Sequence, residues 1–225
     1  MDPLVVIMLG RAGCGKGTQA ELLKDKFGLF YVGSGELLRD RTKTQDFTGK
    51  KIAETMESGV LVPVVLMLHQ WANRLEEIKR NENGGFKGLI FDGSPRKLVE
   101  AELLDEALGW YDWDKNVRVV LIDISREDAF DRLTKRRMCK NCGQLIPYVG
   151  HYKTLEECDK CGGELIARKD DNINAINERL DLFDKEVMAA VKYFEGKGIL
   201  VKVDGDQSIE KVHEDILAVL NLKNQ

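Results

Sequence analysis

The stretch LGRAGCGKGTQAELL, residues Leu9 to Leu23, decides how this chain begins its fold. The apolar run Leu4–Leu9 leads into it and has the length of a strand that is buried on both faces of a parallel sheet. Four glycines then turn the chain within eight residues, and from Thr18 to about Phe27 the apolar residues recur at helical spacing. The order of strand, glycine-rich loop and helix predicts the opening unit of an α/β fold.

The rest of the chain alternates in the same manner. Further apolar runs of strand length, with helical patterns between them, occur at Gly88–Phe91, Val117–Ile124 and Ile199–Val203. Two late helices are predicted, one from Ile173 to Phe194 that Gly196 ends, and one that Ser208 caps. We expect their apolar stripes to pack in the core of a doubly wound parallel sheet.

Composition places the chain among ordinary globular proteins. Its 225 residues, 43 % apolar and 32 % charged, suffice for one hydrophobic core and a small inserted module. The net charge of −4 argues against broad nucleic-acid binding. No apolar run is long enough for a membrane span or a secretory signal, so we expect a cytoplasmic protein without membrane partners.

Four of the five cysteines form two close pairs, Cys139-x-x-Cys142 and Cys158-x-x-Cys161, separated by fifteen residues. In a chain expected in a reducing compartment, this spacing indicates a tetrahedral zinc site with four thiolates and a structural role. The alternatives are free cysteines, an iron centre and a nucleic-acid-binding zinc ribbon. The segment from about Lys135 to Asp171 is therefore predicted to be a small insertion that the metal holds together.

The glycine-rich loop matches the first seven positions of a Walker A phosphate loop, Gly10-x-x-x-x-Gly15-Lys16. Glycines allow backbone N–H groups to converge on phosphates, Lys16 adds a positive charge, and the next helix presents its N-terminus to the same anion. A glycine-rich turn without a ligand is the alternative. Gly17 stands where the common pattern has Ser or Thr.

The hydroxyl residue comes one position later than in the common pattern, as Thr18 after Gly17. This arrangement resembles the loop of adenylate kinases and related nucleoside monophosphate kinases, G-x-P-G-x-G-K-G-T-Q, with Ala12 at the proline position. Six further segments resemble motifs of that family in the same order: Gly33–Arg39, Gly59–Pro63, Phe91–Arg96, Arg132–Arg137, Arg168–Asp171 and Glu178–Leu180. The resemblance therefore covers nearly the whole chain.

The resemblance implies a P-loop NTPase fold with a doubly wound, five-stranded parallel sheet. It implies a core of residues 1–32, 63–134 and 172–225, a monophosphate-binding insertion of residues 33–62 and a zinc lid of residues 135–171. The implied reaction is reversible phosphoryl transfer between ATP and AMP, giving two ADP, with Mg²⁺ and under a lid that excludes water. A monomer is implied as well. A nucleotide-gated zinc-ribbon binding protein is the alternative of a different class.

The resemblance also implies which residues bind the nucleotides. On the ATP side they are Gly13, Cys14, Gly15, Lys16, Gly17, Thr18, Arg132, Arg136 and Gln207. On the monophosphate side they are Ser34, Arg39, Val60, Leu61, Val62, Gly93, Arg96, Glu100, Arg168 and Arg179. The implied catalytic residues are Lys16, Arg96, Arg136, Arg168 and Arg179, because phosphoryl transfer depends on positioning polyanions and neutralising their charge. Asp92 is expected to orient Mg²⁺ through water, and Asp170 and Asp171 to orient the lid arginines.

The acceptor pocket departs from the family at Glu100, where adenylate kinases have Gln. An amide both donates to and accepts from adenine, whereas a carboxylate only accepts, which suits the two adjacent donors of guanine. AMP is nevertheless favoured as the acceptor on the overall resemblance, since a glutamate at this position can turn toward solvent. GMP and a pyrimidine monophosphate are the alternatives, and nearby changes at Ser34, Ser94 and Val64-Val65 also point to an altered pocket.

Overall fold

A computed structural model describes residues 2–82, 84–168 and 171–221. Its main sheet has five parallel strands in the order β2-β3-β1-β4-β8. The strands are β1 (Leu4–Gly10), β2 (Phe30–Gly33), β3 (Gly88–Asp92), β4 (Val117–Asp123) and β8 (Leu200–Asp204). The predicted fold class is confirmed.

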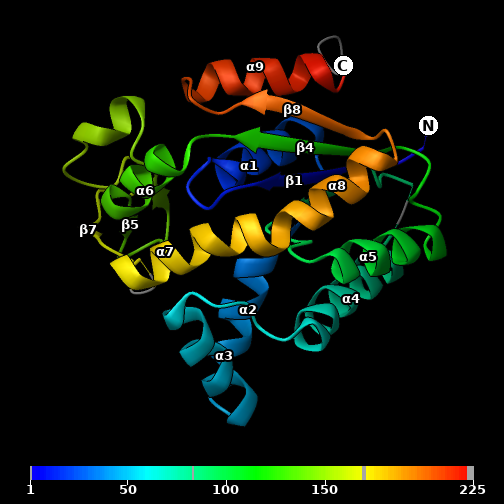
Figure 1. Ribbon diagram of the computed structural model, residues 1–225, viewed down its shortest axis with the longest axis horizontal. Helices are drawn as coiled ribbons and strands as arrows, with labels where there is room; N and C mark the ends of the chain where they lie inside the picture. Colours follow the sequence, from blue (N-terminus) through cyan, green and yellow to red (C-terminus); the bar gives the residue numbers. More distant parts are fainter. Residues whose placement is uncertain (1, 83, 169–170, 222–225) are drawn as a thin grey trace.

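Helices cover both faces of this sheet (Figure 1). They are α1 (Lys16–Phe27), α2 (Ser34–Thr42), α3 (Phe47–Ser58), α4 (Val64–Arg80), α5 (Leu98–Trp110), α6 (Arg126–Lys135), α7 (Ile173–Leu182), α8 (Met188–Gly196) and α9 (Ile209–Val219). Successive residues of β1 face opposite sides, so Val5 and Ile7 join a cluster with α4, α5 and α8, while Val6 and Met8 join one with α1 and α9. This two-sided burial explains the uninterrupted apolar run at the start of the chain.

Strand β2 was not predicted as a separate run. It has four residues and lies at the edge of the sheet, where Phe30 is exposed and only Val32 and Gly33 are buried. So short a half-buried strand leaves too weak a periodic signal to be found from the sequence.

The long late helix is interrupted. Residues Phe183–Val187 between α7 and α8 form a π-helical turn, whereas the sequence predicted continuous helix from Ile173 to Phe194. Ile176 and Leu180 on one side of the turn pack in the cluster with α1 and α9, whereas the apolar residues from Phe183 onward pack in the other cluster. The turn thus lies where the helix passes from one cluster to the other, and Figure 1 shows α7 and α8 crossing the sheet as one diagonal.

The cysteine-bearing segment has a small sheet of its own. Strands β5 (Arg137–Cys139), β6 (Leu145–Ile146) and β7 (Leu165–Ile166) are antiparallel in the order β6-β5-β7, and a 3₁₀ turn, η1, spans Gly150–Thr154. The expected role of Asp170 falls outside the described residues. Within the described part of the chain, no helix is long and apolar enough to cross a membrane.

Candidate active site

A cleft of about 790 Å³ follows the carboxyl ends of the central strands. Strand β1 pairs with β3 on one side and with β4 on the other. The strand order therefore changes direction at β1, and open α/β sheets bind ligands at the carboxyl ends of the strands at such a point. Every residue predicted to bind a nucleotide lines this one cleft, including the glycines of the loop and the arginines at positions 39, 96, 132, 136, 168 and 179. The structure therefore brings together side chains that are up to 194 positions apart, as Gly13 and Gln207 are.

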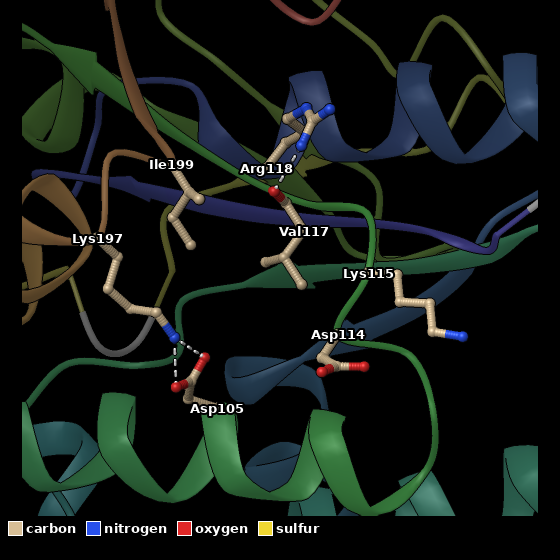
Figure 2. Close-up of a pocket in the computed structure, with 7 residues that line it drawn as sticks. All are labelled: Asp105, Asp114, Lys115, Val117, Arg118, Lys197 and Ile199. Carbon is tan, nitrogen blue, oxygen red and sulfur yellow. Dashed lines mark hydrogen bonds and ion pairs between the residues drawn. The ribbon is translucent and has the colours of Figure 1, made fainter.

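A second cavity of about 220 Å³ lies at the opposite, amino end of β4 and is shown in Figure 2. Two of its charged residues pair with each other, because Asp105 bonds to Lys197, and Asp105 also accepts a hydrogen bond from Tyr193 at 3.0 Å. None of the predicted nucleotide-binding residues lines it.

The phosphate loop has the backbone that its glycines permit. Gly13 and Gly15 have φ angles of 86° and 97°, and the Cβ of any residue replacing Gly10 would lie 2.4 Å from the carbonyl oxygen of Ile122. Gly15 caps α1 without a side chain, so no side chain covers the first-turn N–H groups that would face an anion. Lys16 Nζ donates to the carbonyl oxygens of Gly10 and Arg11, each at 2.8 Å, which holds the ammonium over the loop.

Four half-buried arginines of the cleft, at positions 96, 136, 168 and 179, are coupled through their charges. Burial lowers the pKa of Arg96, and Arg179 lowers it further. Burial likewise lowers the pKa of Arg136, and Arg168 and Arg179 oppose its charge. Such a set of repelling cations is compensated best by a polyanion, which marks this end of the cleft as the place where phosphates meet.

A single carboxylate organises two of these arginines. The side chain of Asp171 is 3 % exposed, and its Oδ1 accepts from Arg136 Nη2 at 2.7 Å and from Arg179 Nη1 at 2.9 Å. Arg136 Nε donates to the other oxygen, so that pair is bidentate. Asp171 thus joins the end of the cysteine-bearing segment to α7, as expected of a residue that orients lid arginines.

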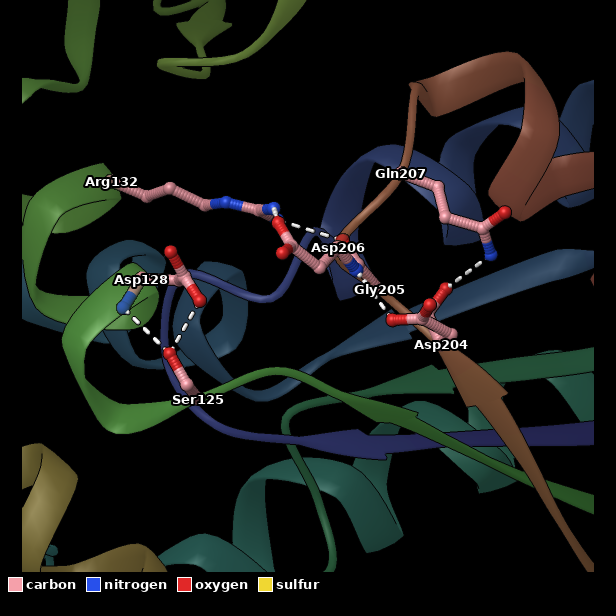
Figure 3. A network of polar contacts seen from close by, with 7 residues as sticks. All are labelled: Ser125, Asp128, Arg132, Asp204, Gly205, Asp206 and Gln207. Carbon is pink, nitrogen blue, oxygen red and sulfur yellow. Dashed lines mark hydrogen bonds and ion pairs between the residues drawn. The ribbon is translucent and has the colours of Figure 1, made fainter.

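The far end of the cleft holds the polar network drawn in Figure 3. Arg132 Nη1 donates to the carbonyl oxygen of Gly205 at 3.0 Å, and its Nη2 pairs with Asp206 at 3.1 Å. The guanidinium is thereby held flat against the loop after β8, where a planar base can stack on it. Gln207 lies beside it, but its amide donates to Asp204 O at 2.9 Å and to Asp215 at 3.1 Å, so protein groups occupy its N–H donors.

The four paired cysteines meet in one cluster. Their Sγ atoms all lie within 4.8 Å of one another, with 3.5 Å between those of Cys139 and Cys161 and 3.7 Å between those of Cys142 and Cys158. Four sulfurs about 2.3 Å from a tetrahedral zinc lie about 3.8 Å apart, so the donor set fits that ion. The backbone N–H of Cys142 lowers the pKa of Cys139 to about 6, which favours a thiolate ligand.

A family model described as adenylate kinase matches residues 8–199. The chain belongs to the adenylate kinase family of phosphotransferases. The adenylate kinase of Thermodesulfovibrio yellowstonii is 37 % identical over 219 residues, which cover 97 % of this chain and 99 % of that protein. The adenylate kinase of Caldanaerobacter subterraneus is 36 % identical over 220 residues, covering 96 % and 95 %, and that of Archaeoglobus fulgidus is 36 % identical over 217 residues, covering 96 % and 97 %. The family that the motifs indicated is confirmed.

The acceptor pocket of this family member differs from the expectation in one respect. Glu100 does not turn toward solvent, since it is only 3 % exposed and its Oε2 accepts the backbone N–H of Arg96 at 2.8 Å. Burial raises the pKa of its carboxyl group. The expectation that Glu100 can turn toward solvent is therefore wrong, because its carboxyl group belongs to the pocket.

Tyr31 is a site residue that the sequence analysis missed. Its hydroxyl donates to Asp92 Oδ2 at 2.8 Å, and burial together with that carboxylate raises the pKa of the phenol, which keeps the proton on the donor. Gly33, which is paired with Asp92 in the sheet, leaves room for this contact, because a Cβ there would lie 2.4 Å from the tyrosine ring. Asp92 Oδ2 also lies 3.3 Å from the position that a Cβ on Gly17 would occupy, so the Asp92 carboxylate faces the start of α1. A fixed carboxylate beside a phosphate loop fits a magnesium ion held through water.

Replacing Tyr31 with phenylalanine is expected to raise the Mg²⁺ concentration needed for half-maximal activity about fivefold, since a hydrogen bond to a charged group is lost. The turnover rate at saturating Mg²⁺ is expected to stay nearly unchanged. Tyr193→Phe is the matched control, because that hydroxyl donates to Asp105 outside the cleft. An unchanged Mg²⁺ dependence in Tyr31→Phe would show that Asp92 does not need this hydrogen bond.

Proposed function

We propose that this chain transfers the γ-phosphoryl group of ATP reversibly to AMP and so forms two ADP. The observation that carries the proposal is the group of mutually repelling arginines, joined by Asp171, at the end of a cleft that begins at a phosphate loop. A binding protein has no need for that concentration of charge, whereas a phosphoryl transfer enzyme uses it to stabilise its transition state.

In the proposed mechanism the two nucleotides bind end to end along the cleft. The loop from Gly13 to Thr18 and Lys16 hold the ATP phosphates, and Arg132 covers the donor base. Arg39 and Arg96 hold the α-phosphate of the acceptor. An oxygen of that phosphate attacks the γ-phosphorus while the bond from the γ-phosphorus to the bridging β-oxygen breaks.

The charge of the transferring group is carried by three arginines, Arg136, Arg168 and Arg179. Asp171 holds Arg136 and Arg179 in fixed positions through hydrogen bonds, so these two side chains need little reorganisation when the transition state forms. A bound Mg²⁺ would supply positive charge that neutralises part of the charge on the phosphates. Asp92, fixed by Tyr31, would orient it through bound water.

We further propose that residues 33–62 close over the acceptor and that residues 135–171 close over the donor as a zinc-stapled lid. Gln144, Tyr148 and Arg168 of the latter segment already line the cleft. A closed lid excludes water, which otherwise competes as the phosphoryl acceptor. The five cysteines are free, which agrees with the proposed action in the reducing cytoplasm. Light scattering on a sizing column would test the expected monomer.

A coupled assay with ATP and each of the four common nucleoside monophosphates tests the proposal. ADP formation from AMP is expected, and Lys16→Met is expected to abolish it, since the loop then lacks its cation. Saturable nucleotide binding without phosphoryl transfer to any monophosphate would contradict the proposed activity and favour a nucleotide-gated binding protein.

A further inference from the structure

Glu100 is a charged residue that is only 3 % exposed. It lies in the first turn of α5 and lines the cleft that also contains the arginines. A carboxylate repels phosphate, so the part of the acceptor that meets Glu100 has to be its uncharged end, the base. Among the described residues no basic side chain forms an ion pair with its carboxyl group, which instead accepts the backbone N–H of Arg96.

The walls around Glu100 suit a flat ring. Leu38, Val62 and Met67 line the cleft and belong to the same apolar cluster as Ala101, the residue that follows Glu100. Ser94 adds a polar group to this region, since its Oγ is buried in the cleft lining and has no hydrogen-bond partner. A base held between apolar walls would have its polar edge read by the few polar atoms present.

The charges that act on Glu100 are few. Burial raises its pKa, while the backbone N–H of Arg96 and the charges of Arg96 and Lys97 lower it to a smaller degree. From the neighbouring elements, α2 and α4 contribute the apolar Leu38 and Met67, and Arg179 of α7 and Asp92 of β3 act on Arg96. Burial therefore makes the neutral form of this carboxyl group easier to reach than it is for a solvent-exposed glutamate.

The two protonation states match different bases. A neutral carboxyl group offers one donor and one acceptor, which pair with the ring nitrogen N1 and the amino group of adenine. A carboxylate offers two acceptors, which pair with the N1–H and the amino group of guanine but repel the lone pair on N1 of adenine.

We propose that Glu100 must carry a proton to bind adenine and that its ionised form selects guanine, so that the acceptor preference of this enzyme changes with pH. Binding of AMP to ionised enzyme then takes up one proton from solvent onto a carboxylate oxygen of Glu100, and binding of GMP takes up none. The proposal rests on the proposed function, since it names the acceptor of that same reaction.

The first test is the ratio of kcat/KM for AMP to kcat/KM for GMP, measured from about pH 5.5 to about pH 8.5, where neither base titrates. Effects on ATP binding, on the lid and on the shared phosphate cancel in this ratio. This ratio is expected to fall about tenfold or more as the pH rises, because ionisation of Glu100 replaces a matched pair of hydrogen bonds to adenine with a mismatch.

The matched variants are Glu100→Gln and Glu102→Gln. The first is expected to give an AMP-favouring ratio that does not change with pH, since an amide keeps its donor and acceptor. The second changes an exposed glutamate on the same helix and is expected to behave like the parent. A flat ratio in the parent, or the same slope in Glu100→Gln, would overturn the proposal.

Calorimetry of AMP and GMP binding in two buffers with different ionisation enthalpies provides a readout that needs no turnover. Proton uptake is expected with AMP for the parent near neutral pH and is expected to be absent with GMP and in Glu100→Gln. Phosphoryl transfer to AMP without base-dependent proton uptake would refute the role of Glu100 and leave the proposed function standing. Absence of transfer to every monophosphate would instead refute the proposed function.

Discussion

Replacing Arg179 with methionine is expected to lower kcat by roughly 10³-fold or more, because the transferring phosphoryl group loses one of its compensating charges. The fold is expected to survive the change. Asp171 would keep its bidentate pair with Arg136, so the buried carboxylate would not be left without a cation. Single-turnover kinetics, with thermal unfolding of the same preparation, would separate lost chemistry from lost structure.

Arg118→Met is the matched control for this experiment. Arg118 is an exposed arginine at the amino end of β4, where it borders the small cavity of Figure 2 and bonds to the carbonyl oxygen of its neighbour Val117 at 3.1 Å. We expect its replacement to leave kcat within a factor of about two of the parent value, because charges outside the cleft are screened by solvent. If Arg179→Met kept kcat within about tenfold of the parent, the arginine group would not be the transition-state site.

Replacing Cys158 with serine is expected to remove the zinc ion and unfold the lid. Among the described residues from 135 to 168, the buried ones are Cys139, Ile146, Cys158 and Gly163, so the segment has almost no apolar core. We therefore expect a metal held by the four cysteines to supply its stability, as in other small zinc-bound modules. We expect loss of bound zinc, a lower unfolding temperature and a large fall in kcat, since an unfolded lid cannot exclude water or place Arg136.

Cys14→Ser separates the metal site from the other cysteine. Cys14 is 3 % exposed and lies in the phosphate loop, remote in sequence from the cluster. That variant is expected to retain a single zinc ion per chain by elemental analysis, whereas Cys158→Ser should retain none. Treatment of the parent with a chelator should reproduce the lower unfolding temperature of Cys158→Ser, and unchanged unfolding after complete metal removal would contradict a zinc-dependent lid.

The local features of this protein are determined by its sequence alone. The phosphate loop is a run of neighbouring residues whose glycines reach backbone angles that other residues avoid, so its shape and its ligand class follow from those residues. The cysteine pairs are local in the same sense, because their spacing sets which donors can share one ion. The family and the fold class could be predicted on this basis, and every residue predicted to bind a nucleotide lies in the lining of the cleft.

Tertiary structure decided the contacts between distant residues. The pairing of Gly33 with Asp92 in the sheet brings Tyr31 to a carboxylate 61 positions away, and no local pattern records that register. The burial of Glu100 depends in the same way on how α5 packs against the rest of the fold, including α4 and α8, which is why the expectation that it would turn to solvent was wrong. Local geometry limits what a short segment can bind, whereas the pKa and the partners of a side chain depend on everything packed around it. The sequence by itself therefore determined where phosphates bind, and only the packed structure decided the setting of the carboxyl group in the acceptor pocket.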